Sequence, residues 1–383
     1  MPRKIRMGMV GGGRGAFIGN VHRMAAALDG QIDLVCGAFS SNAEKSKLSG
    51  QDLYLNPDRV YGSYEEMISK ESALPQDIRI DLVSIVTPNH MHYAPSKMAI
   101  EHGFHIICDK PLSFDLDEAY DLKKIVDDSG LIFALTHNYT GYPLVKQAKQ
   151  MIRNGELGDI RKVVVEYPQG WLSTALEATE QKQAAWRTDP AKSGIAGAMG
   201  DIGTHAENLV EYITGLKIKS LCADISILVK GRRLDDDGNV LLRFENGARG
   251  ILYASQISAG EENGLRIKVY GEKGGIEWIQ LEPNSLEVKW LDKPKQILRT
   301  GVGDLYPETQ AHTRIPAGHP EGYLEAFANI YRNVAKCIQA KISNEVVDPI
   351  FTDFPGIDDG VRGMNFIYKV IESGQSDQKW IEL

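Results

Sequence analysis

Short apolar runs alternate with amphipathic stretches along the first third of the chain. Five of the apolar runs are typical of buried strands, and they cover residues 5–10, 32–39, 81–87, 105–108 and 132–136. Between them the pattern predicts helices over residues 16–28, 95–102 and 116–129, and Ser63 and Glu66 have capping-box spacing before a further short helix. Nearly continuous apolar strands separated by helices are typical of a parallel sheet that is buried on both faces. We therefore predict a doubly wound α/β domain over residues 1–140.

A different pattern follows a predicted helix over residues 144–153. Strands are expected at residues 161–167, 223–230, 240–245, 248–257, 265–270 and 275–280, and helices at residues 201–213, 323–339 and 358–373. The dipeptide Asn246-Gly247 between two of these strands favours a tight hairpin turn. Residues 296–318 have the least regular pattern and are expected to form a loop that reaches towards the active site. We predict a second α/β domain over residues 141–383, with a large, mainly antiparallel, open sheet.

Length and composition agree with two globular domains, since 383 residues exceed one ordinary core. The net charge of −8 argues against nucleic acid or an anionic membrane as a partner. The four cysteines are far apart in the sequence, so they favour a reducing compartment and indicate no zinc site. With no signal region and no apolar stretch of membrane-spanning length, the expected location is the cytoplasm.

A glycine-rich turn, Gly11-Gly12-Gly13-Arg14-Gly15-Ala16, joins the first predicted strand to the first predicted helix. In this position it has the form of the dinucleotide fingerprint of a Rossmann domain, in which the backbone approaches a pyrophosphate that rests on the helix N-terminus. The alternative is a glycine turn without a ligand. The cofactor contacts expected here are Gly11, Gly13, Arg14, Ala16, Phe17 and Ile18.

The choice between NAD and NADP is normally made at the carboxyl end of the second strand. Asp33 lies near the amino end of that strand, and Ser40 and Ser41 follow its carboxyl end without an acid. Hydroxyl groups can bind a ribose diol or a phosphate, so both cofactors stay open, with a slight preference for NAD. No metal ion is required.

Three further polar loops follow strands of the same predicted sheet. They are Thr87-Pro88-Asn89-His90-Met91-His92, Asp109-Lys110-Pro111 and His137-Asn138-Tyr139. Ligands of open α/β sheets bind beyond the carboxyl ends of the strands, where these loops converge. Thr87, Asn89, Asp109, Lys110 and Asn138 are therefore expected beside the cofactor, and Tyr139 beside a substrate.

These motifs resemble those of the glucose–fructose oxidoreductase / inositol dehydrogenase / MocA family. Asp109-Lys110-Pro111 looks like the family's Glu-Lys-Pro motif, with aspartate in place of the usual glutamate, and Gly200-Asp201-Ile202-Gly203-Thr204-His205 resembles its Asp/His segment. The resemblance covers essentially the whole chain. It implies reversible oxidation of a secondary alcohol on a sugar, inositol or related compound, a homodimer or homotetramer, and a place near the cofactor for His92. The tracts 185–190 and 318–322 resemble members of the levoglucosan dehydrogenase type, which act on pyranoses and anhydrosugars.

The oxidation of an alcohol needs a base within hydrogen-bond reach of the hydroxyl proton. Asp201 and His205 are four residues apart on a predicted helix, so their side chains share one face. His205 titrates near neutral pH, Asp201 could orient it or bind the substrate, and Lys110 could stabilise a developing alkoxide or accept the proton itself. The immediate base is therefore either Lys110 or His205.

Aromatic and polar side chains of the second half are candidates for a sugar pocket, because aromatic faces cover C–H surfaces and polar groups bind hydroxyls. The candidates are Trp171, Trp186, Arg187 and His319, and core packing is an equal alternative for the two tryptophans.

Two other functions remain open. One is an NAD-dependent glycosidase or lyase that recycles its cofactor internally. The other is a non-catalytic dinucleotide-binding sensor, which would need neither Lys110 nor His205.

Overall fold

The computed structural model describes residues 3–383 and divides the chain into two compact units. The first unit contains residues Met1–Gly141 and Tyr323–Val361, and the second contains Tyr142–Gly322 and Arg362–Leu383. The division after Gly141 lies next to the expected domain boundary. The segment Tyr323–Val361, however, belongs to the first unit, whereas the prediction placed all residues after 140 in the second domain.

The first unit is built on a five-stranded parallel sheet in the order β2-β1-β3-β4-β5. Its strands are β1 (Ile5–Gly11), β2 (Ile32–Ala38), β3 (Leu82–Val86), β4 (His105–Cys108) and β5 (Phe133–Leu135). Its helices include α1 (Phe17–Leu28), α2 (Ala43–Asp52), α3 (Tyr64–Ser72), α4 (Tyr93–Glu101), α5 (Leu116–Ser129) and α11 (Tyr323–Ser343). The predicted doubly wound sheet is confirmed, and the expected helix cap is present, since the Glu66 backbone N–H donates to the Ser63 hydroxyl.

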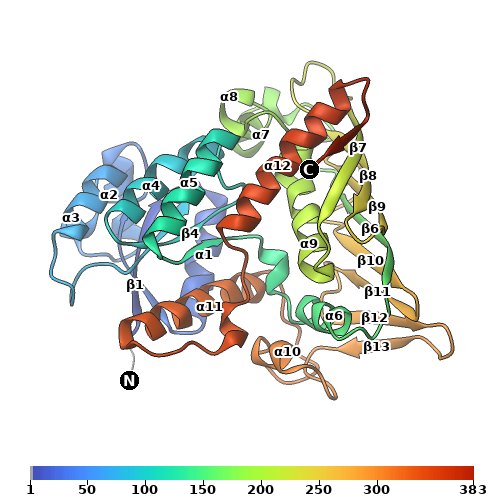
Figure 1. Cartoon of the computed structure of the whole chain (residues 1–383). Helices are drawn as coiled ribbons and strands as arrows, with labels where there is room; N and C mark the ends of the chain where they lie inside the picture. The colour runs from blue at the N-terminus through green and yellow to red at the C-terminus, as the bar shows by residue number, and fades with distance from the viewer. Residues whose placement is uncertain (1–2) are drawn as a thin grey trace. The chain divides into compact units, whose positions relative to one another are not determined.

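The sheet of the first unit lies between two helical layers (Figure 1). Helices α1 and α11 pack against each other, while α4 packs against α3 and α5. One core cluster joins alternate side chains of β1, namely Ile5, Met7 and Met9, to Val21 of α1 and Val334 of α11. Burial of this apolar surface fixes α11 on the sheet, although α11 begins about 190 residues after β5 in the sequence.

The second unit is built on a nine-stranded sheet in the order β13-β12-β11-β10-β6-β9-β8-β7-β14. All neighbouring strands are antiparallel except β6 and β9, so the predicted mainly antiparallel sheet is confirmed. The strands are β6 (Ile160–Pro168), β7 (Ile218–Ser226), β8 (Asp237–Phe244), β9 (Arg249–Ser255), β10 (Arg266–Gly271), β11 (Gly274–Ile279), β12 (Ser285–Trp290), β13 (Gln296–Arg299) and β14 (Trp380–Glu382).

Several local predictions for this unit were wrong. The strand expected at 223–230 runs over Ile218–Ser226 instead, and β12 and β14 were not predicted. Part of the segment 296–318 is regular, since it contains β13 and the short helix α10 (Pro307–Ala311). The Asn246-Gly247 hairpin is present: Gly247 has φ +91°, and the Asn246 side chain accepts a hydrogen bond from the Ala248 backbone.

Helices cover one face of the nine-stranded sheet (Figure 1). They include α6 (Pro143–Arg153) and α9 (Thr204–Thr214), while α12 (Ile357–Gln375) packs its Gly374 against Ile225 of β7. Along β8 the side chains alternate, with Val240, Leu242 and Phe244 buried and the intervening ones exposed. The opposite face of the sheet is therefore open to solvent.

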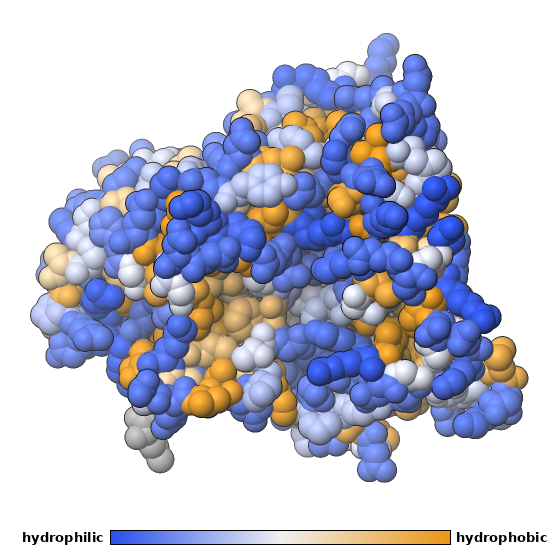
Figure 2. All heavy atoms as spheres, in the orientation of Figure 1, coloured by the Kyte–Doolittle hydropathy of each residue, from blue (hydrophilic) through white to orange (hydrophobic). Residues whose placement is uncertain are grey.

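The molecular face in Figure 2 is mostly hydrophilic, with apolar residues in small groups. No helix among residues 3–383 is long and apolar enough to cross a membrane. Within the same described range, no group of three or more His, Cys, Asp or Glu side chains is arranged to hold a metal ion.

Candidate functional site

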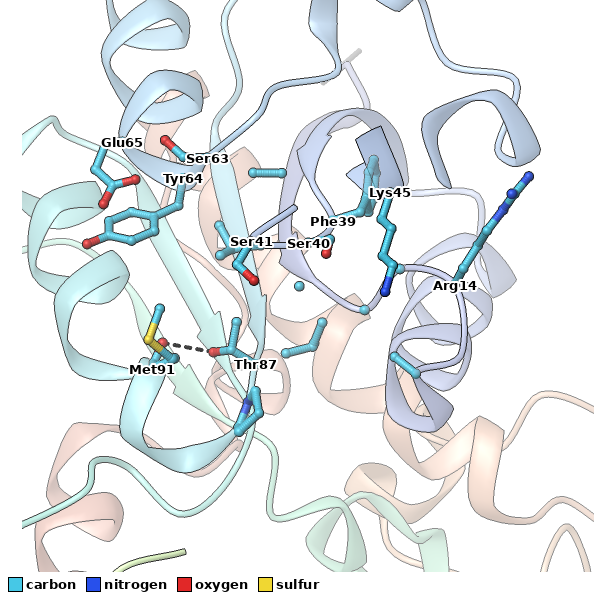
Figure 3. A pocket seen from close by; sticks show the side chains of 18 of the residues that line it. Arg14, Phe39, Ser40, Ser41, Lys45, Ser63, Tyr64, Glu65, Thr87 and Met91 are labelled. Carbon is cyan, nitrogen blue, oxygen red and sulfur yellow. Dashed lines mark hydrogen bonds between the residues drawn. The ribbon is translucent and has the colours of Figure 1, made fainter. Parts of the chain in front are cut away.

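The turn after β1 forms one wall of a cavity of about 580 Å³ in the first unit (Figure 3). Gly11 and Gly12 have φ angles of +82° and +71°, which side chains rarely tolerate. Gly13 donates its backbone N–H to the Phe39 carbonyl at 3.1 Å, and a Cβ at Gly13 would lie 2.6 Å from that same oxygen. Glycine is required here because the turn presses against the end of β2.

Most of the residues expected around the pyrophosphate and ribose line this cavity. They are Gly11, Gly13, Arg14, Ala16, Ser40, Ser41 and Thr87. Phe17 and Ile18 are outside that wall: Phe17 is 63% exposed, and Ile18 packs against the core cluster. The Arg14 guanidinium turns away from the cavity to Asp52, where its Nη2 donates to the carboxylate at 2.7 Å (Figure 3).

Several wall residues were missed by sequence reasoning. Phe39, Lys45, Ser63, Tyr64, Glu65, His90 and Met91 also line the cavity. Lys45 follows β2 on α2, whose N-terminus is capped by Asn42 accepting from the Lys45 backbone. Asp33 forms an ion pair with Lys4 at the amino end of β2, far along the strand from this cavity, as its position in the sequence predicts. The signal that could have identified Lys45 as a wall residue is its position four residues after Ser41, close behind the carboxyl end of β2.

His92 joins two loops at the carboxyl edge of the parallel sheet. Its Nδ1 lies 2.7 Å from the Pro111 carbonyl oxygen and its Nε2 lies 2.8 Å from the Thr87 carbonyl oxygen. The ring is fully buried, and burial lowers the pKa of His92. It thereby ties the Thr87 loop, part of the cavity wall, to the loop that carries Lys110. Asn89 is also buried beside it.

Asp109 and Lys110 follow β4 directly, at the same edge of the sheet. Asp109 accepts a 2.7 Å hydrogen bond from the Thr136 hydroxyl. Burial and the Lys110 charge lower the pKa of His137 to about 3, so that imidazole is neutral at pH 7. The next residues in the chain, Asn138 and Tyr139, are buried too.

In the second unit, Asp201 lies in a π-helical turn, Met199–Gly203, that runs into α9. The expectation of one regular helix from Asp201 was wrong, because this turn precedes the helix. Asp235 anchors the turn, since its buried carboxylate accepts from the backbone N–H groups of Gly197 at 2.6 Å and Met199 at 2.7 Å. Single π-helical turns inside helices are frequent at functional sites.

Side chains of its own unit hold the Asp201 carboxylate. Gln256, just after β9, donates to it at 2.8 Å, and the Arg187 Nε donates at 3.2 Å. The Arg187 guanidinium in turn stacks over two indole rings, 4.2 Å from the centroid of Trp186 and 6.0 Å from that of Trp171. The sequence candidates Trp171, Trp186, Arg187 and Asp201 are thus brought together.

His205, on the first turn of α9, is buried beside the carboxyl end of β6. Its ring centroid lies 6.4 Å from that of Tyr167, whose hydroxyl donates to Asn263 at 2.8 Å. Tyr167 and Gln256 were missed, although both stand where β6 and the parallel strand β9 end. His319 is exposed, and its Nδ1 lies 3.2 Å from the Pro316 carbonyl oxygen of its own loop.

The fold and these sites define a dinucleotide-binding protein with a Rossmann unit and a second unit that gathers acidic, imidazole and indole groups. Residues 5–139 match the family model for the NAD-binding Rossmann fold of an oxidoreductase family, and residues 145–277 match the GFO/IDH/MocA C-terminal domain.

Individual relatives agree with the family models. An uncharacterised oxidoreductase of Bacillus subtilis, YfiI, is 37% identical over 99% of this chain and 97% of its own. A levoglucosan dehydrogenase of Pseudarthrobacter phenanthrenivorans is 27% identical over 75% of this chain and 76% of its own.

A solved structure is similar over the full length. An inositol dehydrogenase homologue of Azotobacter vinelandii, crystallised with NAD⁺, is 34% identical over 100% of this chain and 98% of its own, with a TM-score of 0.94. The same homologue crystallised with NADH and myo-inositol has a TM-score of 0.92. The chain belongs to the GFO/IDH/MocA family of oxidoreductases.

Proposed function

We propose that this protein is an NAD(P)-dependent dehydrogenase that oxidises a secondary hydroxyl of a sugar, anhydrosugar or inositol-like polyol to a ketone. The observation that carries the proposal is the group formed by Asp201, Arg187, Trp186 and Trp171. Indole faces beside a carboxylate and a guanidinium suit a polyol, which presents both C–H surfaces and hydroxyls. The inositol dehydrogenase homologue with NADH and myo-inositol supports this substrate class.

The bound nicotinamide would supply the acceptor for the hydride that leaves the alcohol carbon. The glycine turn, Ser40, Ser41 and Thr87 would hold the dinucleotide. In the second unit, Asp201 would accept a hydrogen bond from a substrate hydroxyl. Lys110 or His205 would take the hydroxyl proton, and a charged Lys110 would stabilise alkoxide character at that oxygen.

The substrate is proposed to be uncharged, because Arg187 is already paired with the Asp201 carboxylate. A phosphate or carboxylate on the substrate would compete with Asp201 for Arg187. NAD is the preferred cofactor in this proposal, since the Azotobacter homologue was crystallised with NAD⁺ and with NADH.

The open face of the nine-stranded sheet supports a homodimer or homotetramer. Leu241 is 49% exposed and Ile251 37% exposed on adjacent strands of this face. A second copy would cover these apolar side chains. The proposed compartment is the cytoplasm.

The test follows the absorbance of reduced nicotinamide while the purified protein meets NAD or NADP and a panel of pyranoses, anhydrosugars and inositols. Lys110→Ala and His205→Ala are run beside the wild type, with the surface variant Lys124→Ala as a control. The proposal predicts substrate-dependent reduction that both site variants lose and the control retains. Cleavage of a glycoside without net reduction would favour the glycosidase alternative, and cofactor binding with no turnover would favour a sensor.

A further inference from the structure

A chain of three buried polar side chains lies behind the lysine motif in the first unit. The hydroxyl of Tyr331, on α11, lies 2.7 Å from Nδ1 of His22, on α1, and 2.8 Å from the hydroxyl of Ser84, on β3. None of the three side chains reaches solvent. Burying three polar groups in an apolar core costs free energy, so their mutual hydrogen bonds are needed to offset that cost.

One arrangement of the hydrogen atoms satisfies this chain and also directs an N–H towards Asp109. In it Ser84 donates to the Tyr331 oxygen, Tyr331 donates to Nδ1 of His22, and His22 carries its N–H at Nε2. The His22 ring is fixed edge-to-face by Phe327, with ring centroids 5.1 Å apart. The orientation of Nε2 is therefore set from α11.

That Nε2 atom is aimed at Asp109. It has no hydrogen-bond partner among the described residues, and it lies 3.7 Å from Asp109 Oδ1. This distance is too long for a hydrogen bond but close for an N–H dipole facing a carboxylate.

The surroundings keep Asp109 ionised. Burial opposes ionisation, but His22, Lys110 and the Thr136 hydroxyl outweigh it and hold the pKa of Asp109 well below its usual range. The carboxylate and the Lys110 ammonium therefore stabilise each other's charge.

Burial also acts on the other titratable groups around this pair. Burial lowers the pKa of His92 and His137, and burial raises the pKa of Cys108 and Tyr331. Asp109 is therefore a charged neighbour of Lys110 in this unit.

We propose that His22 and Tyr331 are positioning residues that, with Ser84, orient the Asp109 carboxylate and thereby fix the negative charge beside Lys110 in the active site. The role in turnover rests on the proposed dehydrogenase function. The effect on the lysine's charge does not, so it is measured separately.

The first readout is the rate at which acetic anhydride acylates Lys110, followed by peptide mass spectrometry across pH, because only the neutral amine reacts. The variants are Tyr331→Phe, Asp109→Asn and the double variant, with Ile338→Val as the control that alters the packing of α11 two turns away from Tyr331 without removing a polar group. Urea unfolding confirms that each variant is folded.

Asp109→Asn is expected to raise the acylation rate at pH 7 about tenfold, which corresponds to a one-unit change in the titration of the amine. Tyr331→Phe should raise it about threefold, and the double variant should match Asp109→Asn, because Tyr331 acts through Asp109. Ile338→Val should react as the wild type does. An unchanged rate in Tyr331→Phe, or single effects that multiply in the double variant, would overturn the proposal.

The second readout is turnover, in which Tyr331→Phe should lower kcat with little change in the KM for the cofactor. If the wild type reduces no cofactor on the polyol panel, the proposed function fails while the acylation result still decides the role of the buried chain.

Discussion

The glycine that brings α1 against the turn lies where the fold leaves no room for a side chain. Gly19 lies on α1, and a Cβ added there would be 2.4 Å from the Gly12 Cα and 2.5 Å from the Gly12 carbonyl oxygen. Carbon atoms in contact are normally separated by about 3.5–4.0 Å. Gly19→Ala therefore requires the helix and the turn to separate by about 1 Å or more.

This displacement has two expected costs. Overpacking of a close backbone contact destabilises by about 1–3 kcal/mol, against a gain of about 1 kcal/mol from alanine in a helix interior. We expect a net loss of stability of up to about 2 kcal/mol. The backbone N–H groups of residues 11–16 would also move away from the pyrophosphate, so cofactor affinity should fall tenfold or more, by analogy with the roughly hundredfold losses that 1 Å misplacements can cause.

The assay is a fluorescence titration with NADH, paired with urea unfolding. Gly356→Ala is the matched control, because the Cβ there would lie 3.6 Å from the Phe133 carbonyl oxygen, an ordinary contact. If Gly19→Ala binds NADH as tightly as the wild type and unfolds at the same urea concentration, the argument from close approach is refuted.

Three further predictions follow from other parts of the chain. Asp235→Ala leaves two buried N–H groups without an acceptor and should cost about 2–5 kcal/mol in urea unfolding and lower kcat, whereas unchanged values would contradict the anchoring role of Asp235. His105 accepts a hydrogen bond from the Ile132 backbone, and its pKa is lowered by burial to about 4, so the unfolded chain binds the extra proton and stability falls as pH drops from about 6.5 to 4. His105→Asn keeps an acceptor but cannot titrate, so it should flatten the plot of unfolding free energy against pH, and an unchanged slope would contradict this. Light scattering should give a dimer or tetramer, and a Leu241→Lys variant should weaken it if the open sheet face is the interface.

The architecture of the first unit was largely predictable, because each buried strand carries its own continuous apolar run. Residues 105–108 and 116–129 were predicted with the bounds that the structure gives. The helix α11 was expected near its true position, but its return to the parallel sheet was not. That placement depends on complementary surfaces of Val334 and β1 residues that are far apart in the sequence.

The second unit was harder to predict because pairing between strands, rather than local pattern, defines its edges. β13 and β14 are short edge strands with four and three residues, so neither carries a periodic signal. The π-helical turn at Asp201 also has no period of its own, and it depends on Asp235, thirty-four residues later.

The residues of the candidate site also fall into those that the sequence identified and those that it did not. Motifs with fixed spacing pointed to the glycine turn, Lys110, Asp201 and His205. His22 gave no such signal, because its partners Tyr331 and Asp109 come from other elements. Likewise, the sequence alone did not connect Gln256 with Asp201, because that contact depends on the pairing of β9 with β6.

The most direct test of the proposed chemistry is to follow the hydrogen that leaves the substrate carbon. The wild-type protein is incubated with NAD⁺ and an inositol or anhydrosugar deuterated at its ring carbons, and the cofactor is analysed by mass spectrometry. The proposal predicts NADH that is one mass unit heavier than NADH formed from the unlabelled substrate, together with a ketone product. Recovery of NAD⁺ alone, under conditions where the protein binds it, would contradict the dehydrogenase.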